Sequence, residues 1–551
     1  MCAAARLRIN MIRISSLKLN PSHSKDDLTG AVSRKLRLNE CDIKEVKIVK
    51  KSLDARDKSN IFWNYIVDIE TENEEKILRE FKNDRNICRA GKKEYVLPAQ
   101  GKEPLKERPC IIGSGPAGLF CAYFLARYGY RPVLIEQGQC VEERIKTAEK
   151  FWRDGSLNPR SNVQFGEGGA GTFSDGKLTS GVKDTAGRKS LVLETFVENG
   201  APEEILYLNK PHIGTDILSE VVSSMRNKII SWKGEVLFNT RFIDLAARDN
   251  ELISIALECE DKILIRPCTA LVLAPGHSCR ETFYMLKDLG LNIEAKAFAV
   301  GVRCEHPQEE INRAMYGENY RLLYKDALPP ADYKLTYKAR DGRGVYSFCM
   351  CPGGYVVNSS SEEGALCING MSYSKRDSGV ANSAIVVSVS PEDTNSLEDP
   401  MNGIRFQEMI ERAAFKETGG LIASQRLCDF KSGSISKYPD EPFFSRTKGG
   451  AKSADLNKIL PDFISSDIKE AFGGFAHKIK GFDNDNVILS APETRTSCPV
   501  RILRDEHFES NIKGIFPAGE GAGYSGGITS SAIDGIKIFE EIFRRFGARQ
   551  L

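Results

Sequence analysis

Apolar residues recur in short strand-like and helix-like runs over the first hundred residues of the chain. The clearest run is Ile61-Phe62-Trp63-Asn64-Tyr65-Ile66-Val67-Asp68, whose alternation is typical of a half-buried strand. The whole pattern predicts strands at residues 12–19, 43–49, 61–69 and 94–97, and helices at residues 25–36 and 72–81. Their order, β-α-β-β-α-β, predicts a ferredoxin-like α+β domain over residues 1–100.

A polar linker at residues 99–108 separates this unit from a second, larger pattern. That pattern contains a β-α-β unit at residues 109–136, a glycine-rich stretch at 166–181, and a closing strand, glycine turn and helix at 514–546. A long mixed region lies between the last two. We therefore predict an α/β fold, in which a Rossmann-type nucleotide-binding domain (101–296 and 492–551) encloses an inserted α+β substrate domain (297–491).

The β-α-β unit carries a glycine turn between its first strand and its helix. An apolar run at residues 108–112 leads into Gly113-Ser114-Gly115-Pro116-Ala117-Gly118, and a helix is expected at 119–128. Gly113 permits the tight turn, Gly115 allows close approach of a pyrophosphate, and Gly118 allows the helix to pack on the strand. The helix N-terminus adds free N–H donors. We expect all six residues of the turn to form a dinucleotide site.

Further candidates for this site follow the second strand, residues 131–135. Glu136 lies eighteen positions beyond Gly118, where a carboxylate can accept both hydroxyls of an adenosine ribose and would repel a 2′-phosphate. Gln137 is adjacent. Arg144, on the next helix, is a candidate phosphate contact, although a surface arginine fits the pattern equally well. Phe242, at the end of a strand-like run from 235, is a candidate for backbone contact to adenine.

The C-terminal glycine turn favours FAD over NAD as the dinucleotide. A short strand ends at Gly519-Glu520, and Gly526-Gly527-Ile528 opens a helix expected at 529–546. In flavoproteins such an acid meets the ribityl or pyrophosphate region, and the helix N-terminus stabilises negative charge on the reduced ring. Between the two turns, a strand ends in Ala274-Pro275-Gly276, which resembles the segment that many flavoproteins place near the pyrophosphate. The predicted nucleotide-binding domain is therefore an FAD-binding domain.

Four longer segments carry a family resemblance: residues 164–178, 211–216, 348–354 and 493–497. They resemble a widespread family of uncharacterised FAD-dependent dehydrogenases with the glutathione-reductase-type flavoprotein fold, related to fumarate-reductase-like and geranylgeranyl-reductase-like flavoproteins. The resemblance covers nearly the whole chain and implies FAD binding and redox activity, but no substrate. It also implies that the first of these segments lies over the FAD pyrophosphate and flavin through Gly168, Gly169, Ala170, Ser174 and Lys177. A solvated glycine-rich loop is the alternative.

The catalytic residues are not identified by any motif. Cys349 and Cys351 are candidate redox partners or acids beside a flavin, or else two small side chains lining a strand. His277 and Arg303 are candidate acids or bases. Arg495 is a candidate for binding an anionic substrate, or for pairing with Glu493. We expect no metal site, because the six histidines show no zinc-ligand spacing.

Composition excludes several other classes of protein. The chain has 551 residues, of which 41% are hydrophobic and 28% charged, as in globular proteins. Its net charge of +2 predicts neither a nucleic-acid partner nor attachment to anionic lipid. Fifteen cysteines without a recognisable secretory leader indicate reduced thiols and a cytoplasmic protein, and no stretch has the length and composition of a membrane span.

The resulting hypothesis is an FAD-dependent oxidoreductase, a dehydrogenase or reductase, that exchanges hydride between flavin N5 and a small-molecule substrate. Because a second complete dinucleotide fingerprint is missing from the sequence, electrons come from the substrate, from transiently bound NAD(P)H, or from a protein electron donor. The alternative is an RNA-binding or tRNA-modifying flavoprotein. It depends on the nine basic and five acidic residues of 34–58 and on Trp63 and Tyr65, as potential base-stacking aromatics.

Overall fold

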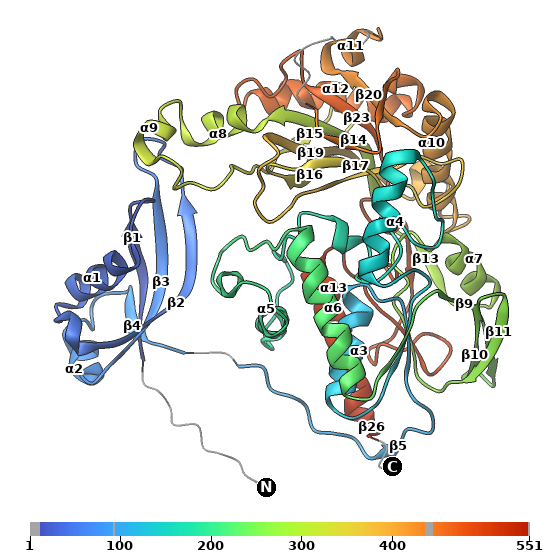
Figure 1. Cartoon of the computed structure of the whole chain (residues 1–551), viewed down its shortest axis with the longest axis horizontal. Coiled ribbons are helices and arrows are strands. Elements are labelled where there is room, and N and C mark those ends of the chain that lie inside the picture. Colours follow the sequence, from blue (N-terminus) through green and yellow to red (C-terminus); the bar gives the residue numbers. More distant parts are fainter. Residues whose placement is uncertain (1–10, 92–93, 436–444, 549–551) are drawn as a thin grey trace.

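The computed structural model describes residues 11–91, 94–435 and 445–548. Figure 1 shows three bodies: a small N-terminal sheet with two helices, a nucleotide-binding body that contains both ends of the remaining chain, and a sheet-and-helix body from its middle. The predicted fold class, α/β with a Rossmann-type domain, is confirmed. Among the described residues, none of the helices combines the length and apolarity needed to cross a bilayer.

The N-terminal body is a four-stranded antiparallel sheet of order β2-β3-β1-β4. Its elements are β1 (Met11–Leu19), α1 (Lys25–Leu36), β2 (Ile43–Asp54), β3 (Phe62–Thr71), α2 (Glu74–Glu80) and β4 (Ile87–Arg89). Ile12 and Ile14 of β1 and Val67 and Ile69 of β3 are buried in one cluster with Val32 of α1. This is the strand order of the ferredoxin-like arrangement.

The prediction of a strand at residues 94–97 is wrong. The fourth strand is β4, which pairs with β1 through Ile12, Arg13 and Ile14. Tyr95 and Leu97 instead pack on the hydrophobic core of the nucleotide-binding body. The apolar residues that suggested a strand are thus used to attach the linker.

The nucleotide-binding body is built on a parallel sheet of order β25-β12-β6-β7-β8. The strands are β6 (Cys110–Ile112), β7 (Val133–Ile135), β8 (Glu235–Leu237), β12 (Leu271–Leu273) and β25 (Ile515–Pro517). This sheet shares one hydrophobic core with several helices, among them α3 (Pro116–Arg127), α6 (Thr215–Ser231) and α13 (Ile528–Arg545). Strands from both ends of the chain are neighbours here, so the site at their carboxyl edge joins distant segments.

Helices α3 and α13 lie against one another at a glycine contact. A Cβ on Gly535 would stand 2.1 Å from the main-chain oxygen of Ala117, so only glycine permits this approach. Helix α3 begins at Pro116, three residues earlier than predicted, because proline is compatible with the first helical turn. The remaining elements of this body are α4 (Val141–Asp154), α5 (Arg188–Glu198), α7 (Arg280–Asp288), β5 (Glu103–Pro104) and β26 (Phe546–Gly547).

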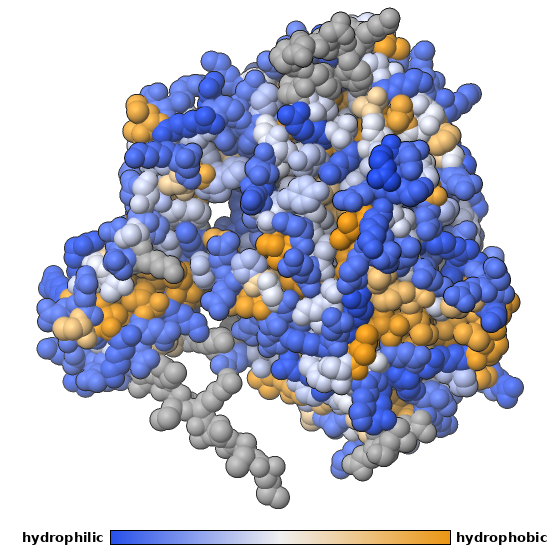
Figure 2. Space-filling view, viewed as in Figure 1, coloured by the Kyte–Doolittle hydropathy of each residue, from blue (hydrophilic) through white to orange (hydrophobic). Residues whose placement is uncertain are grey.

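A three-stranded antiparallel sheet, β11-β10-β9, extends from the nucleotide-binding body. It comprises β9 (Thr240–Arg248), β10 (Glu251–Cys259) and β11 (Lys262–Pro267). The predicted run from 235 to 242 is therefore divided between two sheets, and the chain turns at Asn239 with a φ of 51°. The outer strand β11 exposes Ile263, Leu264 and Ile265, which form an apolar surface in Figure 2.

The body from the middle of the chain, for which the sequence predicts a substrate domain and which keeps that name below, contains a seven-stranded sheet of order β15-β16-β19-β14-β23-β20-β22. Its strands are β14 (Phe298–Pro307), β15 (Thr336–Lys338), β16 (Gly344–Cys351), β19 (Val380–Val389), β20 (Ile422–Arg426), β22 (Ala451–Ser453) and β23 (Ile488–Glu493). A smaller sheet contains β17 (Tyr355–Asn358), β18 (Ile368–Met371) and β21 (Thr447–Lys448), and β13 (Ile293–Ala295) pairs with β24 (Val500–Ile502). The helices are α8 (Gln308–Tyr316), α9 (Tyr320–Tyr324), α10 (Asn402–Thr418), α11 (Leu427–Ser432) and α12 (Asp462–Ala476).

The far end of the N-terminal hairpin β2-β3 contacts the other two bodies. Lys51 exchanges main-chain hydrogen bonds with Tyr207 and Asn209, at 2.7 and 2.9 Å. The Ile61 amide donates to the hydroxyl of Tyr324 on α9, at 2.8 Å. These contacts hold the small sheet at the edge of the molecule, as Figure 1 shows.

Candidate cofactor and active site

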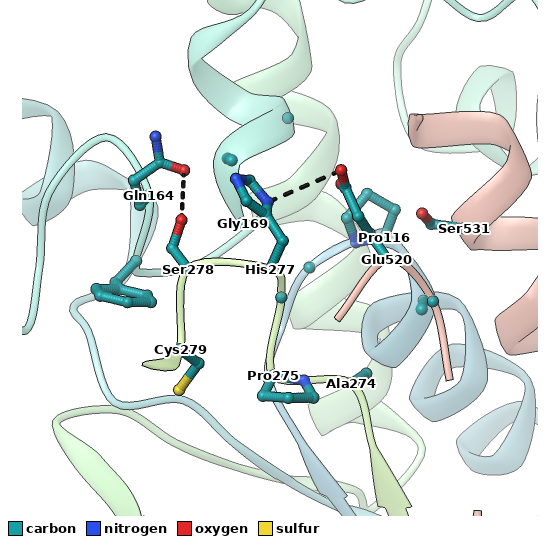
Figure 3. A pocket seen from close by; sticks show the side chains of 18 of the residues that line it. Pro116, Gln164, Gly169, Ala274, Pro275, His277, Ser278, Cys279, Glu520 and Ser531 are labelled. Atoms are coloured by element: carbon teal, nitrogen blue, oxygen red, sulfur yellow. Dashed lines mark hydrogen bonds and ion pairs between the residues drawn. The ribbon is translucent and has the colours of Figure 1, made fainter. Parts of the chain in front are cut away.

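A cavity of about 370 Å³ extends from the glycine turn of the nucleotide-binding body to the sheet of the substrate domain. Figure 3 shows part of its wall, with Gln164 and Ser278 toward one side of the view and Pro116, Glu520 and Ser531 toward the other. Nineteen of the predicted cofactor residues line it: Gly113, Gly115, Pro116, Ala117, Glu136, Gln137, Gly169, Ala170, Ser174, Lys177, Phe242, Ala274, Pro275, Gly276, Gly519, Glu520, Gly526, Gly527 and Ile528.

Two helices direct uncapped N-termini at this cavity. Gly115 precedes α3 and Gly527 precedes α13, and neither helix has a side chain that caps its first amides. Free N–H groups and the positive end of the helix dipole favour anions or electron-rich groups at both places. A Cβ on Gly169 would lie 2.9 Å from the Gly115 Cα, so the backbone there leaves no room for side chains. The cavity therefore suits an extended ligand with two electron-rich parts.

Three further residues of the predicted set support the turn without lining the cavity. The Ser114 hydroxyl and amide both bind Glu136. A Cβ on Gly118 would stand 2.0 Å from the Gly113 carbonyl oxygen, in agreement with its predicted packing role. Gly168 has a φ of 83° and packs against Thr172. Contact of Ser114 and Gly168 with the ligand stays a prediction, since neither residue lines the cavity.

The Glu136 carboxylate already has four hydrogen-bond donors from the protein. Oε2 accepts from the Ser114 amide at 2.9 Å and hydroxyl at 2.7 Å, and Oε1 accepts from the amides of Gly138 and Gly166, at 3.0 and 3.1 Å. These fill the acceptor capacity of an ionised carboxylate. Glu136 thus joins the glycine turn to the segment after β7 and the loop at Gly166, and a ribose hydroxyl would have to replace one of these donors.

Arg144 differs from the expected phosphate contact. Its guanidinium is fully buried and donates to five main-chain oxygens, those of residues 162, 163, 166, 167 and 169. Burial lowers its pKa to about 10. The prediction that Arg144 contacts a phosphate is wrong, because its N–H groups bind main-chain oxygens and its side chain does not line the cavity. It shapes the loop that carries Gly169.

His277 and Glu520 face one another across the cavity wall in Figure 3. The His277 Nδ1 lies 3.8 Å from Oε1 of Glu520. Burial lowers the pKa of His277 to about 3 and raises that of Glu520 to about 7. The Nε2 of His277 is buried without a hydrogen-bond partner in the part of the chain that the structure describes. The imidazole is therefore neutral and holds one polar atom available to a ligand.

Lys177 places a cation on the cavity wall. Its backbone forms a β-bridge with His212, and its Nζ lies 3.8 Å from Oδ2 of the buried Asp175. Asp175 is itself paired with Arg376, whose Nε donates to it at 3.0 Å. This arrangement leaves the ammonium of Lys177 only loosely paired, beside the predicted flavin region.

Of the three catalytic candidates in the substrate domain, one lines the cavity and two do not. Cys349 lines the cavity, whereas Cys351 and Arg303 are buried and do not. The Arg303 guanidinium binds both oxygens of Glu493, at 2.9 and 2.8 Å, and donates to the main-chain oxygen of Cys349 at 3.1 Å. The prediction that Arg303 is a catalytic acid or base is therefore wrong, because its N–H groups bind Glu493 and the Cys349 main chain and the residue does not line the cavity.

Arg495 also differs from both sequence expectations. It lines the cavity, but its Nε and Nη2 bind the buried Glu411 on α10 at 3.0 and 2.9 Å, and its Nη1 binds the hydroxyl of Ser361. Glu493, the expected partner, pairs with Arg303. The prediction that Arg495 binds an anionic substrate through two nitrogens is wrong, because its Nε and Nη2 already bind Glu411.

Several cavity residues were not predicted. Gln164 and Ser278 are joined by a 3.2 Å hydrogen bond, drawn in Figure 3. The remainder include Phe165, Cys279, Phe348, Asn369, Thr496 and Ser531. Gln164 opens the segment that carries the family resemblance, and Ser278 follows Ala274-Pro275-Gly276. For Gln164, Phe165, Phe348 and Thr496 the available signal was membership of the resembling segments, and for Ser278 it was its position shortly after Gly276.

The contacts of the N-terminal aromatics do not support base stacking. Tyr65 is buried and its hydroxyl lies 2.8 Å from Nε2 of His23. The Lys51 ammonium covers the ring of Trp63 at 4.4 Å from its centroid. Both rings are thus occupied within the domain. Among the described residues, no group of three or more histidines, cysteines or carboxylates is arranged to hold a metal ion.

Comparisons with known proteins agree with the geometry of the cavity. A family model described as "FAD-dependent protein, C-terminal domain-like" matches residues 297–496, and an "NAD(P)-binding Rossmann-like domain" matches residues 111–155. Residues 11–70 match a domain of unknown function. An uncharacterized protein from Clostridium beijerinckii is 45% identical over 539 residues, which cover 97% of this chain and 99% of that protein.

Solved structures show weaker similarity. A quinol fumarate reductase variant from E. coli is 11% identical with a TM-score of 0.36, over 80% of this chain and 70% of that chain. A geranylgeranyl bacteriochlorophyll reductase-like protein from Thermoplasma acidophilum is 10% identical with a TM-score of 0.34, over 79% and 77%. The sequence matches confirm the expected family and its FAD cofactor. The chain belongs, with the Clostridium protein, to this family of uncharacterised FAD-dependent proteins.

Proposed function

We propose that this protein is an FAD-dependent oxidoreductase that exchanges a hydride between flavin N5 and an organic substrate held under the substrate-domain sheet. The observation that carries the proposal is the lining of one cavity. The α3 glycine turn, the N-terminus of α13 and Cys349 of β16 all line it. A redox cofactor bound along it meets a second domain at its reactive end.

The chain's own residues supply distinct parts of the FAD site in this proposal. The amides at the start of α3, with Gly169 opposite, bind the pyrophosphate, and Phe242 lies at the adenosine end. The amides at the start of α13 stabilise negative charge on the flavin pyrimidine edge. His277 Nε2 and Glu520 bind ribityl hydroxyls, which provides a partner for the buried imidazole nitrogen. When bound, FAD supplies two-electron redox chemistry at N5.

The substrate region is the end of the cavity nearest Phe348, Cys349 and Asn369. Asn369 is held by Arg303, whose Nη2 lies 3.3 Å from its Oδ1, so its amide is oriented before a ligand arrives. Lys177, in the glycine-rich stretch at 166–181, contributes a cation to the cavity lining. This surface fits a small organic molecule with polar groups, and the electron donor is the substrate, transiently bound NAD(P)H or a protein carrier.

The test is the visible spectrum of the purified full-length chain, recorded before and after anaerobic addition of NADH or NADPH. We expect a yellow protein with stoichiometric FAD, or one that becomes so on reconstitution. Bleaching by NAD(P)H identifies a reductase, and a stable spectrum assigns the electrons to substrate or a protein donor. A chain that stays colourless after reconstitution contradicts the proposal.

A further inference from the structure

Cys349 and Cys351 lie together at the end of β16, where the strand meets the cavity. The pairing of β16 with β19 is interrupted between Phe348 and Cys351, so the intervening residues bulge out of the sheet. Cys349 has a φ of 43°, a backbone conformation that non-glycine residues rarely adopt. Cys349 lines the cavity and Cys351 is fully buried behind it.

The bulge brings the two cysteines close to one another. The Cys351 thiol donates to the main-chain oxygen of Cys349, with its Sγ at 3.3 Å, and its interaction with the Cys349 thiol is the largest cause that lowers the pKa of Cys349. The positive charges of Lys177 and Arg303 act in the same direction, against the effect of burial. The two thiols therefore differ, because the pKa of Cys349 is lowered whereas that of Cys351 is raised, and this favours Cys349 as the nucleophilic sulfur.

The strained backbone at Cys349 is held by a rigid support. Arg303 donates from Nη1 to the Cys349 oxygen and is fixed by Glu493 and by the Asn382 side chain, at 2.9 Å. Local strain that is over-determined by its surroundings is typical of functional sites. A buried, unreactive pair of small side chains would need neither the strained φ nor a charged support.

We propose that Cys349 and Cys351 form a redox-active dithiol that exchanges two electrons with the bound flavin. The inference rests on the proposed function, because it requires FAD in the cavity. In the oxidising direction Cys349 reacts as the thiolate: a bond forms between the two sulfurs, the Cys351 thiol loses its proton, and two electrons and that proton pass to the flavin. The reverse transfer cleaves the disulfide. No additional reactant is required.

The geometry also sets the direction that is favoured. A disulfide that closes over a single intervening residue departs from relaxed geometry, and strained disulfides are more oxidising than relaxed ones. This disulfide would therefore accept two electrons readily from a reduced flavin, and the resulting dithiol would hold them at the cavity surface. Since Cys351 is buried, Cys349 is the sulfur that meets the flavin or a substrate.

An electron count on the FAD-loaded full-length protein tests the proposal. After oxidation with ferricyanide and removal of the oxidant, anaerobic titration with dithionite should consume four electrons per FAD in the wild type. Cys349→Ser and Cys351→Ser should each consume two. Cys428→Ser, which removes a half-buried thiol outside the cavity, should keep the wild-type count.

A spectroscopic measurement adds an independent readout. In Cys351→Ser the thiolate of Cys349 should give a long-wavelength charge-transfer band with oxidised flavin, visible only at higher pH because the Cys351 thiol no longer stabilises it. Cys349→Ser should lack the band. Where a variant does not fold, alkylation and mass spectrometry of the oxidised wild type should find residues 349 and 351 protected as a disulfide.

The outcomes separate the two proposals. A wild type that binds FAD, takes up two electrons and leaves both thiols open to alkylation overturns the dithiol and leaves the oxidoreductase proposal standing. A chain that cannot bind FAD overturns both. Four electrons in the wild type, together with two in each cavity variant, support the dithiol.

Discussion

The Arg303 guanidinium donates a hydrogen bond across the substrate sheet to the main-chain oxygen of Cys349, at 3.1 Å. Arg303 lies on β14 and Cys349 on β16, with β19 between them. The same guanidinium binds Glu493 on β23 through two nitrogens. One fully buried cation thus fixes the strand that ends at the cavity.

We expect Arg303→Met to lower the free energy of unfolding of the apoprotein by about 3–5 kcal/mol, because it leaves the Glu493 carboxylate buried without its counter-charge. Urea unfolding measures the change. The double variant Arg303→Met/Glu493→Leu should recover part of the loss, since no unpaired charge remains. Lys146→Met, which breaks an exposed ion pair with Glu143, is the control and should leave the midpoint unchanged. Equal stability of the Arg303 variant and wild type would contradict the role assigned to this pair.

The cavity's backbone features were predictable from sequence because they follow local steric rules. Gly113 and Gly118 are required by the turn itself, and Pro116 fits the first turn of a helix. These constraints act over a few residues, so a short motif is sufficient to locate them. The two uncapped helix starts, at Gly115 and Gly527, follow for the same reason.

Side-chain roles were less predictable because they depend on partners that are distant in sequence. The acceptors of Arg144 come from residues 162–169, and the partner of Arg495 is Glu411, 84 positions away. A motif places such a residue near the cavity but cannot show whether its donors are already engaged. The prediction of a strand at 94–97 was wrong for a similar reason, since its apolar residues Tyr95 and Leu97 pack on the core of the nucleotide-binding body.

A substitution at Glu136 distinguishes a structural role from a ribose contact. Glu136→Gln replaces one oxygen by an NH₂ group, so two of the four protein donors lose their acceptor. We expect the apoprotein to lose about 1–3 kcal/mol of stability and FAD affinity to fall. Thermal unfolding without FAD and fluorescence titration with FAD measure the two effects. A ribose contact alone would lower the affinity and leave the apoprotein as stable as wild type.

Gly526 offers a way to block the flavin region without disturbing the fold. A Cβ there meets no atom within 4 Å, and the residue lines the cavity. We expect Gly526→Val to keep the apoprotein's melting temperature and to lower FAD affinity at least tenfold, because the side chain occupies the approach to α13. The matched control is Gly473→Val, an exposed glycine on α12 with equally open surroundings, which should bind FAD as wild type does. Undiminished affinity in Gly526→Val would place the flavin elsewhere.

The stability of the apoprotein should depend on pH through Glu520. Burial raises the pKa of this carboxyl from 4.5 to about 7, so between these values the folded protein retains a proton that the unfolded chain releases. Its contribution to stability is therefore complete below about pH 4.5 and is lost as pH rises through 7. Glu520→Gln removes this dependence, since the amide does not ionise.

The free energy of unfolding of Glu520→Gln minus that of wild type should be larger at pH 8 than at pH 5, by on the order of 1–3 kcal/mol. Urea unfolding of the FAD-free protein at both pH values measures the difference. The exposed Glu143→Gln provides the control, and its effect should be the same at the two pH values. His277 has the opposite slope, because its lowered pKa costs stability as pH falls below 6.5. A constant difference between wild type and Glu520→Gln would show that the pKa of this carboxyl is not raised in the folded protein.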